Sequence, residues 1–142
     1  MSDTTTSGIV FDTELIKKYD IAGPRYTSYP TAVQFTPDFT EQDYREQAAL
    51  SNQSNRDLSL YFHLPFCDTI CYYCACNKVI TKDRSKADPY LQALHKEIAM
   101  QAELFDSSRK VNQLHWGGGT PTFINHQQMT ELMQVTRKHF NL

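Results

Sequence analysis

The chain has 142 residues, of which 40% are hydrophobic and 21% charged, as in an ordinary globular protein. Fourteen Lys and Arg residues against sixteen Asp and Glu residues give a formal net charge of −2, which argues against nucleic acid or an anionic membrane as the main partner. The sequence has neither an apolar stretch approaching the ~20 residues that span a bilayer nor the opening pattern of a signal peptide. We therefore expect a cytoplasmic protein that does not contact a membrane and whose thiols stay reduced.

The first part of the chain, residues 1–56, is predicted to be an N-terminal arm that precedes the regular fold. Asp12 is a suitable N-cap for a short helix over 13–19. A second helix is predicted over 41–50, with Thr40 as its N-cap. The arm should therefore be partly helical and partly irregular.

A regular pattern begins with residues 57–142. Apolar side chains alternate with other side chains over 58–64, which predicts a strand with one wholly apolar face. The opposite face presents the phenol of Tyr61 and the imidazole of His63. Both side chains come directly before a cysteine-rich loop, so the strand should lead its polar face into that loop.

Two helices and a second strand are predicted beyond this loop. Asp88 is the expected N-cap of the first helix, with Pro89 at its first position. A strand over 111–116 should end at the glycine run of 117–121, and another helix should start after Asn125. The first helix places apolar side chains on one stripe: Leu91, Leu94, Ile98, Ala102 and Phe105.

The order strand, loop, helix, strand, loop, helix predicts an α/β fold made of two βα units with parallel strands. Functional residues of such units collect at the carboxyl ends of the strands, so the cysteine-rich loop and the glycine run should lie side by side. Two strands are too few to bury a parallel sheet. We therefore expect the chain to be a fragment with an incomplete domain.

All four cysteines lie within ten residues, at positions 67, 71, 74 and 76. In a reducing compartment, such a cluster indicates a metal or redox site. The spacing of Cys67, Cys71 and Cys74 suits a [4Fe–4S] cluster in which three thiolates leave one iron open for the amine and carboxylate of S-adenosylmethionine (SAM). The alternative is a structural zinc site with Cys76 as the fourth ligand, although the chain lacks the second pair of ligands that such sites usually have.

The glycine run, Gly117–Gly118–Gly119, lets the backbone approach a ligand closely, and it is a candidate for holding the amino group of SAM. A tight turn between strand and helix is the alternative interpretation. Tyr73, which stands between two candidate ligands, could lie against an adenine ring or shield the cluster from water. Sequence alone leaves both pairs of alternatives open.

Several segments resemble a known family. Cys-Asp-Thr-Ile-Cys-Tyr-Tyr-Cys at 67–74 resembles the signature of radical SAM enzymes, and the run at 117–121 resembles their glycine-rich SAM-binding motif. Segments 23–31, 60–67 and 74–78 resemble oxygen-independent coproporphyrinogen III oxidases in particular. The resemblance implies that the chain is the N-terminal part of a radical SAM partial (β/α) barrel. Segment 23–31, with two prolines, should be irregular or extended.

The resemblance also implies roles for individual residues. Cys67, Cys71 and Cys74 would ligate the cluster, and His63 and Cys76 would be needed for activity without being ligands. The residues that would contact SAM are Tyr61, Tyr73, Gly118, Gly119 and Thr120. Tyr61 could instead be a core tyrosine, and His63 could simply bond to the backbone.

The implied reaction removes carboxyl groups from two propionate side chains of coproporphyrinogen III. A 5′-deoxyadenosyl radical would abstract a hydrogen from the propionate β-carbon, and loss of CO2 and one electron would give the vinyl group of protoporphyrinogen IX. A flavodoxin- or ferredoxin-like protein would reduce the cluster, and the full-length protein would be a monomer. A haem chaperone or cluster-binding module without turnover is the alternative.

Overall fold

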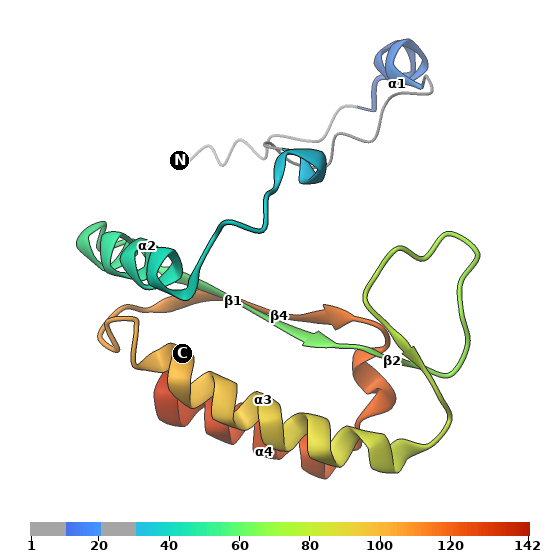
Figure 1. Cartoon of the computed structure of the whole chain (residues 1–142). Coiled ribbons are helices and arrows are strands. Elements are labelled where there is room, and N and C mark those ends of the chain that lie inside the picture. Colours follow the sequence, from blue (N-terminus) through green and yellow to red (C-terminus); the bar gives the residue numbers. More distant parts are fainter. Residues whose placement is uncertain (1–10, 21–30) are drawn as a thin grey trace, which may run out of the picture. The chain divides into compact units, whose positions relative to one another are not determined.

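The structure, a computed structural model, describes residues 11–20 and 31–142 (Figure 1). The predicted irregular segment 23–31 therefore lies, apart from its last residue, outside the described residues. The chain divides into two compact units, residues 1–38 and 39–142. None of the described helices is long and apolar enough to cross a membrane.

In the first unit, helix α1 (Thr13–Tyr19) has the bounds that the sequence predicted. The Asp12 carboxylate accepts hydrogen bonds from the backbone N–H groups of Glu14 and Leu15, at 3.0 and 2.9 Å. These bonds satisfy N–H groups that have no partner within the helix. A 3₁₀ helix, η1 (Ala32–Gln34), follows in the described part.

The second unit is an α/β structure with parallel strands. Its two main strands pair in parallel, and each is followed by a helix in the order that the sequence predicted. The elements are α2 (Glu41–Gln53), β1 (Leu58–Leu64), β2 (Phe66–Cys67), β3 (Val79–Ile80), η2 (Arg84–Lys86), α3 (Ala87–Ala102), β4 (Val111–Gly118), η3 (Pro121–Phe123) and α4 (His126–His139).

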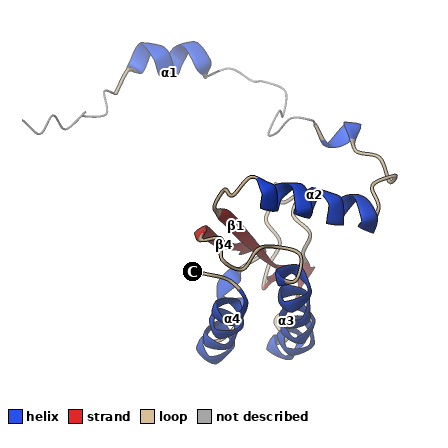
Figure 2. Ribbon diagram, turned by 90° about the vertical axis from the view of Figure 1, so that its left-hand side faces the viewer, coloured by secondary structure: helices blue, strands red, loops and turns tan. Residues whose placement is uncertain are grey.

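Helices α3 and α4 cover one face of the β1–β4 pair (Figures 1 and 2). The apolar face of β1 points into this layer, as its alternating pattern predicted. Tyr61 and His63 belong to the opposite face, and Tyr61 is 57% exposed. The core between sheet and helices includes Phe62, Leu64, Leu91, Leu94, Ile98, Leu132 and Phe140. The helices thus leave the face with the candidate site residues open.

Strand β4 is longer than predicted. The glycine run was expected to end the strand after Trp116, but β4 continues through Gly118. Gly117 and Gly118 stand opposite His63 and Leu64 in the parallel ladder. The prediction failed because the neighbouring strand, which a local pattern cannot reveal, supplies the pairing that holds these glycines extended.

The prediction that Asp88 is the N-cap of the helix after the cysteine-rich loop is also wrong. Helix α3 begins at Ala87, directly after η2, and Asp88 lies inside its first turn. The Asp88 carboxylate instead accepts a hydrogen bond of 2.7 Å from the side chain of Gln128 in α4. Asp83 caps the preceding 3₁₀ turn, which shifts the start of the helix upstream.

Helix α2 has the predicted N-cap, Thr40, which forms a capping box with Asp43, but the helix runs to Gln53 rather than to residue 50. It lies in the same compact unit as the sheet, although the sequence grouped it with the arm. The buried guanidinium of Arg109 donates hydrogen bonds to the Ser51 hydroxyl, the Asn52 side chain and the Arg56 carbonyl. These bonds tie α2 to the start of β4.

After α4 the chain returns to the beginning of β4. Asn141 forms a parallel bridge with Lys110, and its carbonyl accepts a hydrogen bond of 2.7 Å from the N–H of Val111. Residue 141 therefore pairs in parallel with the start of β4. A parallel neighbour is what the repeating βα order predicts for the segment that follows α4.

Candidate functional site

The loop that carries the cysteines is closed at its base by a two-residue parallel sheet. Strand β2 pairs with β3, and residues 68–78 form the loop between them (Figure 1). The Val79 N–H donates to the Pro65 carbonyl at 2.8 Å, and the Thr81 N–H donates to the Cys67 carbonyl at 2.9 Å. The base of this cysteine loop is therefore fixed directly beyond the end of β1.

All four cysteines are free thiols. Cys67 and Cys74 are half-buried, whereas Cys71 and Cys76 are exposed. Among the described residues, no three His, Cys, Asp or Glu side chains are gathered closely enough to hold a metal ion. Three unpaired thiols on one loop are nevertheless a donor set that suits an iron–sulfur cluster. The assignment of Cys67, Cys71 and Cys74 as ligands stays a prediction.

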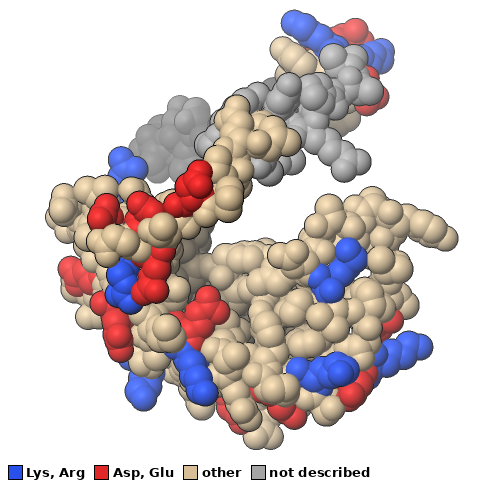
Figure 3. Space-filling model, viewed as in Figure 1, with Lys and Arg blue, Asp and Glu red and all other residues tan. Residues whose placement is uncertain are grey.

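Lys78 holds the last turn of the cysteine loop. Its ammonium group lies 3.3 Å from the carbonyl oxygens of both Cys74 and Cys76. A positive charge is therefore fixed beside the backbone that carries two of the thiols. Over the face shown in Figure 3, basic and acidic side chains are otherwise interspersed, without a large surface of one sign.

Each residue of the glycine run lies against a candidate site residue. A Cβ on Gly117 would come within 2.9 Å of the Tyr61 hydroxyl, and a Cβ on Gly118 within 2.8 Å of the His63 ring. Gly118 also has φ +107°, a conformation that side chains rarely allow. A Cβ on Gly119 would lie 2.5 Å from the Phe66 carbonyl oxygen and 2.9 Å from Cys67 Sγ. The run is therefore glycine because neighbouring groups occupy the space of its side chains.

The glycine run contacts the end of β1 and strand β2, at the base of the cysteine loop, through Gly119 and Thr120. Their N–H groups donate to the carbonyls of Leu64 and Phe66, at 2.8 and 2.7 Å. The Thr120 hydroxyl lies 3.6 Å from Cys67 Sγ. Within the part of the chain that the structure describes, the Gly119 carbonyl accepts no backbone hydrogen bond. The glycine run and the base of the cysteine loop thus meet, as predicted. The Gly119 carbonyl is the backbone acceptor that a ligand would use.

Tyr61 and His63 are joined by a hydrogen bond. The Tyr61 hydroxyl lies 3.2 Å from His63 Nδ1, and His63 Nε2 lies 2.8 Å from the carbonyl oxygen of Asn77 in the cysteine loop. The Tyr90 hydroxyl donates to the backbone carbonyl of His63. Burial, reinforced by Glu97 and Tyr61, raises the pKa of Tyr90 above its ordinary value of 10.0, so this phenol stays a donor at neutral pH.

Sequence reasoning missed one member of this group, His115. Its ring stacks on Tyr61 with centroids 5.7 Å apart and an angle of 13° between the planes. The available signal was the strand register, because His115 stands opposite Tyr61 in the parallel ladder. The backbone carbonyl of Asn77 could not have been found from a pattern of side chains.

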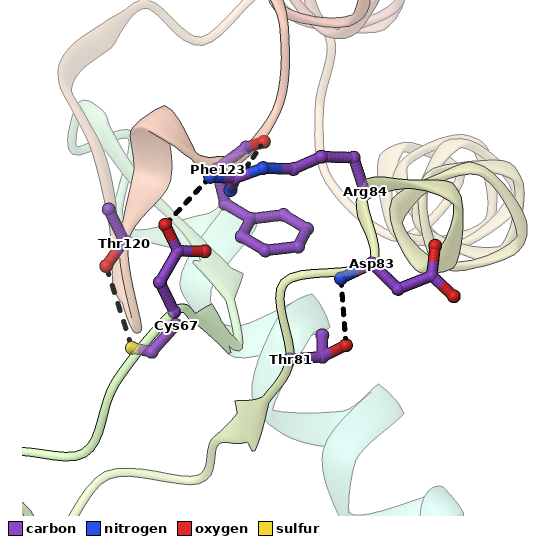
Figure 4. Close-up of polar contacts among 7 residues, drawn as sticks. Cys67, Thr81, Asp83, Arg84, Thr120 and Phe123 are labelled. Atoms are coloured by element: carbon purple, nitrogen blue, oxygen red, sulfur yellow. Dashed lines mark hydrogen bonds and ion pairs between the residues drawn. The ribbon is translucent and has the colours of Figure 1, made fainter.

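An ion pair fixes the beginning of the cysteine loop. Arg84 donates a hydrogen bond of 2.8 Å to the Asp68 carboxylate and one of 3.3 Å to the Phe123 carbonyl. Its guanidinium lies over the Phe123 ring, 4.0 Å from the centroid (Figure 4). This contact connects the loop to the 3₁₀ helix that follows the glycine run. Because both charged groups are about half exposed, we expect the ion pair to add at most about 1 kcal/mol.

The structure thus separates the predicted site residues into two groups. Six of them meet at the carboxyl ends of β1 and β4: Tyr61, His63, Cys67, Gly118, Gly119 and Thr120. The other four lie on the cysteine loop: Cys71, Tyr73, Cys74 and Cys76. Of the second group, Tyr73 is 89% exposed, so packing does not fix its ring.

Comparison with known proteins identifies relatives of the chain. The chain is 52% identical over 132 residues to the oxygen-independent coproporphyrinogen III oxidase of Escherichia coli (strain K12), covering 93% of the chain and 28% of the relative. It is 48% identical over 136 residues to the oxygen-independent coproporphyrinogen III oxidase of Mannheimia haemolytica, covering 96% of the chain and 91% of that relative. No protein-family model matches the chain.

Among solved structures, the coproporphyrinogen III oxidase HemN from E. coli, described as a radical SAM enzyme, matches with a TM-score of 0.75 and 48% identity. The match covers 93% of the chain and 28% of that structure. The chain therefore spans about a quarter of the length of the E. coli relative. Because nearly all of the chain aligns at about half identity, and with the same fold, it belongs to the family of oxygen-independent coproporphyrinogen III oxidases.

Proposed function

We propose that the chain provides the cluster-binding and SAM-binding part of an oxygen-independent coproporphyrinogen III oxidase. The observation that carries this proposal is the contact of Cys67 with Gly119 and Thr120. The thiol of Cys67, the first proposed ligand, lies against the end of the glycine run at the carboxyl edge of a parallel sheet, and this supports the proposal. A ligand that must reach both a metal centre and backbone acceptors would find both there.

Cys67, Cys71 and Cys74 would hold a [4Fe–4S] cluster and leave one iron open. When bound, the cluster would supply the electron that cleaves SAM to a 5′-deoxyadenosyl radical. Backbone hydrogen bonds at the base of the cysteine loop hold Cys67 in place. The thiol of Cys71 is exposed and therefore accessible to an incoming cluster. Cys76 is proposed to act in the reaction without being a ligand.

The glycine run would hold SAM through acceptors rather than donors. The N–H groups of Gly119 and Thr120 are already bonded, whereas the Gly119 carbonyl accepts no backbone hydrogen bond from the described residues and would accept one from an ammonium group. The exposed ring of Tyr73 is available to lie against adenine. The full set of proposed SAM contacts is Tyr61, Tyr73, Gly118, Gly119 and Thr120.

The substrate and the surrounding architecture follow from the family. The relatives' name indicates coproporphyrinogen III, whose two propionates would become the vinyl groups of protoporphyrinogen IX. Residues 57–142 would begin a radical SAM partial (β/α) barrel, preceded by the arm of residues 1–56. A flavodoxin- or ferredoxin-like protein would deliver the electron. The parallel pairing of β1, β4 and Asn141 is what supports the barrel.

Anaerobic reconstitution of the chain with iron and sulfide tests the cluster assignment. We expect broad visible absorbance and about four irons per chain, the content of the proposed cluster. Cys67→Ala, Cys71→Ala and Cys74→Ala should each abolish this absorbance, and Cys76→Ala, the matched control, should retain it. Addition of SAM should change the electron paramagnetic resonance spectrum of the reduced cluster. One zinc per chain without iron or sulfide would contradict the assignment.

A chimera tests the reaction itself. Residues 1–142 would replace the matching segment of the E. coli relative, which is 52% identical. With SAM and a reductant, we expect this chimera to release CO2 from coproporphyrinogen III. The same chimera with Cys67→Ala should release none. A chimera that holds its cluster and cleaves SAM but releases no CO2 would contradict the proposed substrate.

A further inference from the structure

The rings of Tyr61 and His63 are held in place by the sheet on which they lie. The His63 ring lies against Gly118, where a Cβ would come within 2.9 Å of three of its ring atoms. The Tyr61 ring stacks on the ring of His115, and its hydroxyl end lies against Gly117. Neither ring can move closer to β4, and their mutual orientation is set by the hydrogen bond between them.

The partners of His63 determine which of its nitrogens carries the proton. The Asn77 carbonyl can only accept a hydrogen bond, so Nε2 of His63, 2.8 Å away, must be the donor. In the neutral ring Nδ1 is then an acceptor. The Tyr61 hydroxyl, 3.2 Å from Nδ1, must therefore donate its proton to His63.

We propose that Tyr61 and His63 form a directional hydrogen-bond relay, in which His63 is a positioning residue that fixes the Tyr61 hydroxyl. Both imidazole nitrogens are engaged, so His63 acts on a ligand through Tyr61 rather than by exchanging a proton with it. The relay starts at a carbonyl of the cysteine loop and therefore links that loop to the polar face of β1.

The relay defines the kind of group that Tyr61 can bind. Because the phenol proton points to His63, the hydroxyl presents only its oxygen lone pairs. Tyr61 should therefore accept a hydrogen bond from a donor such as an ammonium group or a ribose hydroxyl, and it should disfavour a carboxylate. This part of the inference rests on the proposed function, in which SAM supplies the donor.

The proton position can be measured without any ligand. Nitrogen NMR of the chain with 15N-labelled histidine distinguishes protonated from unprotonated ring nitrogens, and His63→Leu identifies the His63 signals among those of the five histidines. We expect Nε2 to carry the proton, in the chain and in Tyr61→Phe alike. A proton on Nδ1 in the neutral ring would overturn the relay.

A double-mutant cycle on the anaerobically reconstituted chain tests the coupling, with SAM as the probe. Tyr61→Phe and His63→Leu should each weaken SAM binding by up to about tenfold, the value of one lost hydrogen bond. His63→Leu should have no further effect in the Tyr61→Phe background. Tyr44→Phe is the matched control, because it removes a hydroxyl that lines the same cavity but bonds to Gln101 rather than to His63, and it should leave the Kd unchanged.

The outcomes separate the relay from the proposed function. Additive losses in the double variant would show that His63 contacts SAM independently, and they would overturn the relay. If the reconstituted chain holds a cluster but does not bind SAM, the proposed function of the chain fails. The NMR measurement still decides in that case, since it needs neither the cluster nor SAM.

Discussion

Gly119 is the position where a single added methyl group should disturb the site most directly. In Gly119→Ala the new Cβ would lie 2.5 Å from the Phe66 carbonyl oxygen and 2.8 Å from the Pro65 carbonyl carbon. Both are backbone atoms, so the two chain segments must separate. Separation strains the bonds from the N–H groups of residues 119 and 120 to the Leu64 and Phe66 carbonyls. Two hydrogen bonds and the overpacking together should cost about 3 kcal/mol.

Urea unfolding of the chain in reducing buffer, without iron, measures this cost apart from ligand binding. Trp116 is the only tryptophan and lies in β4, so its fluorescence reports on the strand that is disturbed. At a slope of about 2 kcal/mol per molar urea, a loss of 3 kcal/mol lowers the midpoint by about 1.5 M.

Gly117→Ala is the matched control for Gly119→Ala. Its Cβ would meet the ends of the Tyr61 and His115 side chains, which can move aside. We therefore expect a loss of less than about 1.5 kcal/mol for this variant. Equal losses for the two variants, or a loss below about 1 kcal/mol for Gly119→Ala, would refute the packing argument.

Three further substitutions test packing and capping in residues 39–142. Leu132→Ala removes a fully buried side chain, so urea titration should show a loss of about 2–5 kcal/mol; a loss below about 1 kcal/mol would place Leu132 outside the core. Arg109→Leu removes the donor of three part-buried hydrogen bonds and should cost about 1–3 kcal/mol, whereas the exposed Arg45→Leu should change stability by about 0.5 kcal/mol or less. Hydrogen bonds from Thr40 lower the pKa of Asp43 below its ordinary 3.8, so the folded chain binds this proton less tightly than the unfolded chain. The contribution of Asp43 is therefore complete above its ordinary pKa of 3.8 and is lost as pH falls through the lowered pKa. The Tm difference between the native chain and Asp43→Asn should therefore shrink as the pH is lowered, and a difference that grew in acid would contradict the assignment.

Much of the fold follows from local patterns in the sequence. The alternation over 58–64 gave the correct faces of β1, because one side of a strand that meets a helical layer must be apolar. Asp12 and Thr40 marked the starts of α1 and α2, because each side chain satisfies N–H groups of the first turn. The meeting of the cysteine loop with the glycine run followed from the order of the elements alone.

The features that were missed depend on partners that are distant in sequence. Strands β2 and β3 have two residues each, too few to show a period. The extension of β4 through Gly118 depends on the ladder with β1. His63 is oriented by a backbone carbonyl fourteen residues away, and a backbone group carries no sequence signal. The start of α3 was misplaced because two aspartates compete as caps and the upstream Asp83 prevails.

The small sheet of β2 and β3 has a consequence for the order in which the protein is assembled. It closes the base of the cysteine loop with hydrogen bonds and with the buried side chain of Phe66, and the packed core contains none of the four thiols. For the proposed cluster, folding can therefore precede metal insertion, in contrast to small zinc domains that stay unfolded without their ion. Iron and sulfide would be delivered to a finished scaffold, and a chelator would empty the loop without melting the layers beneath it.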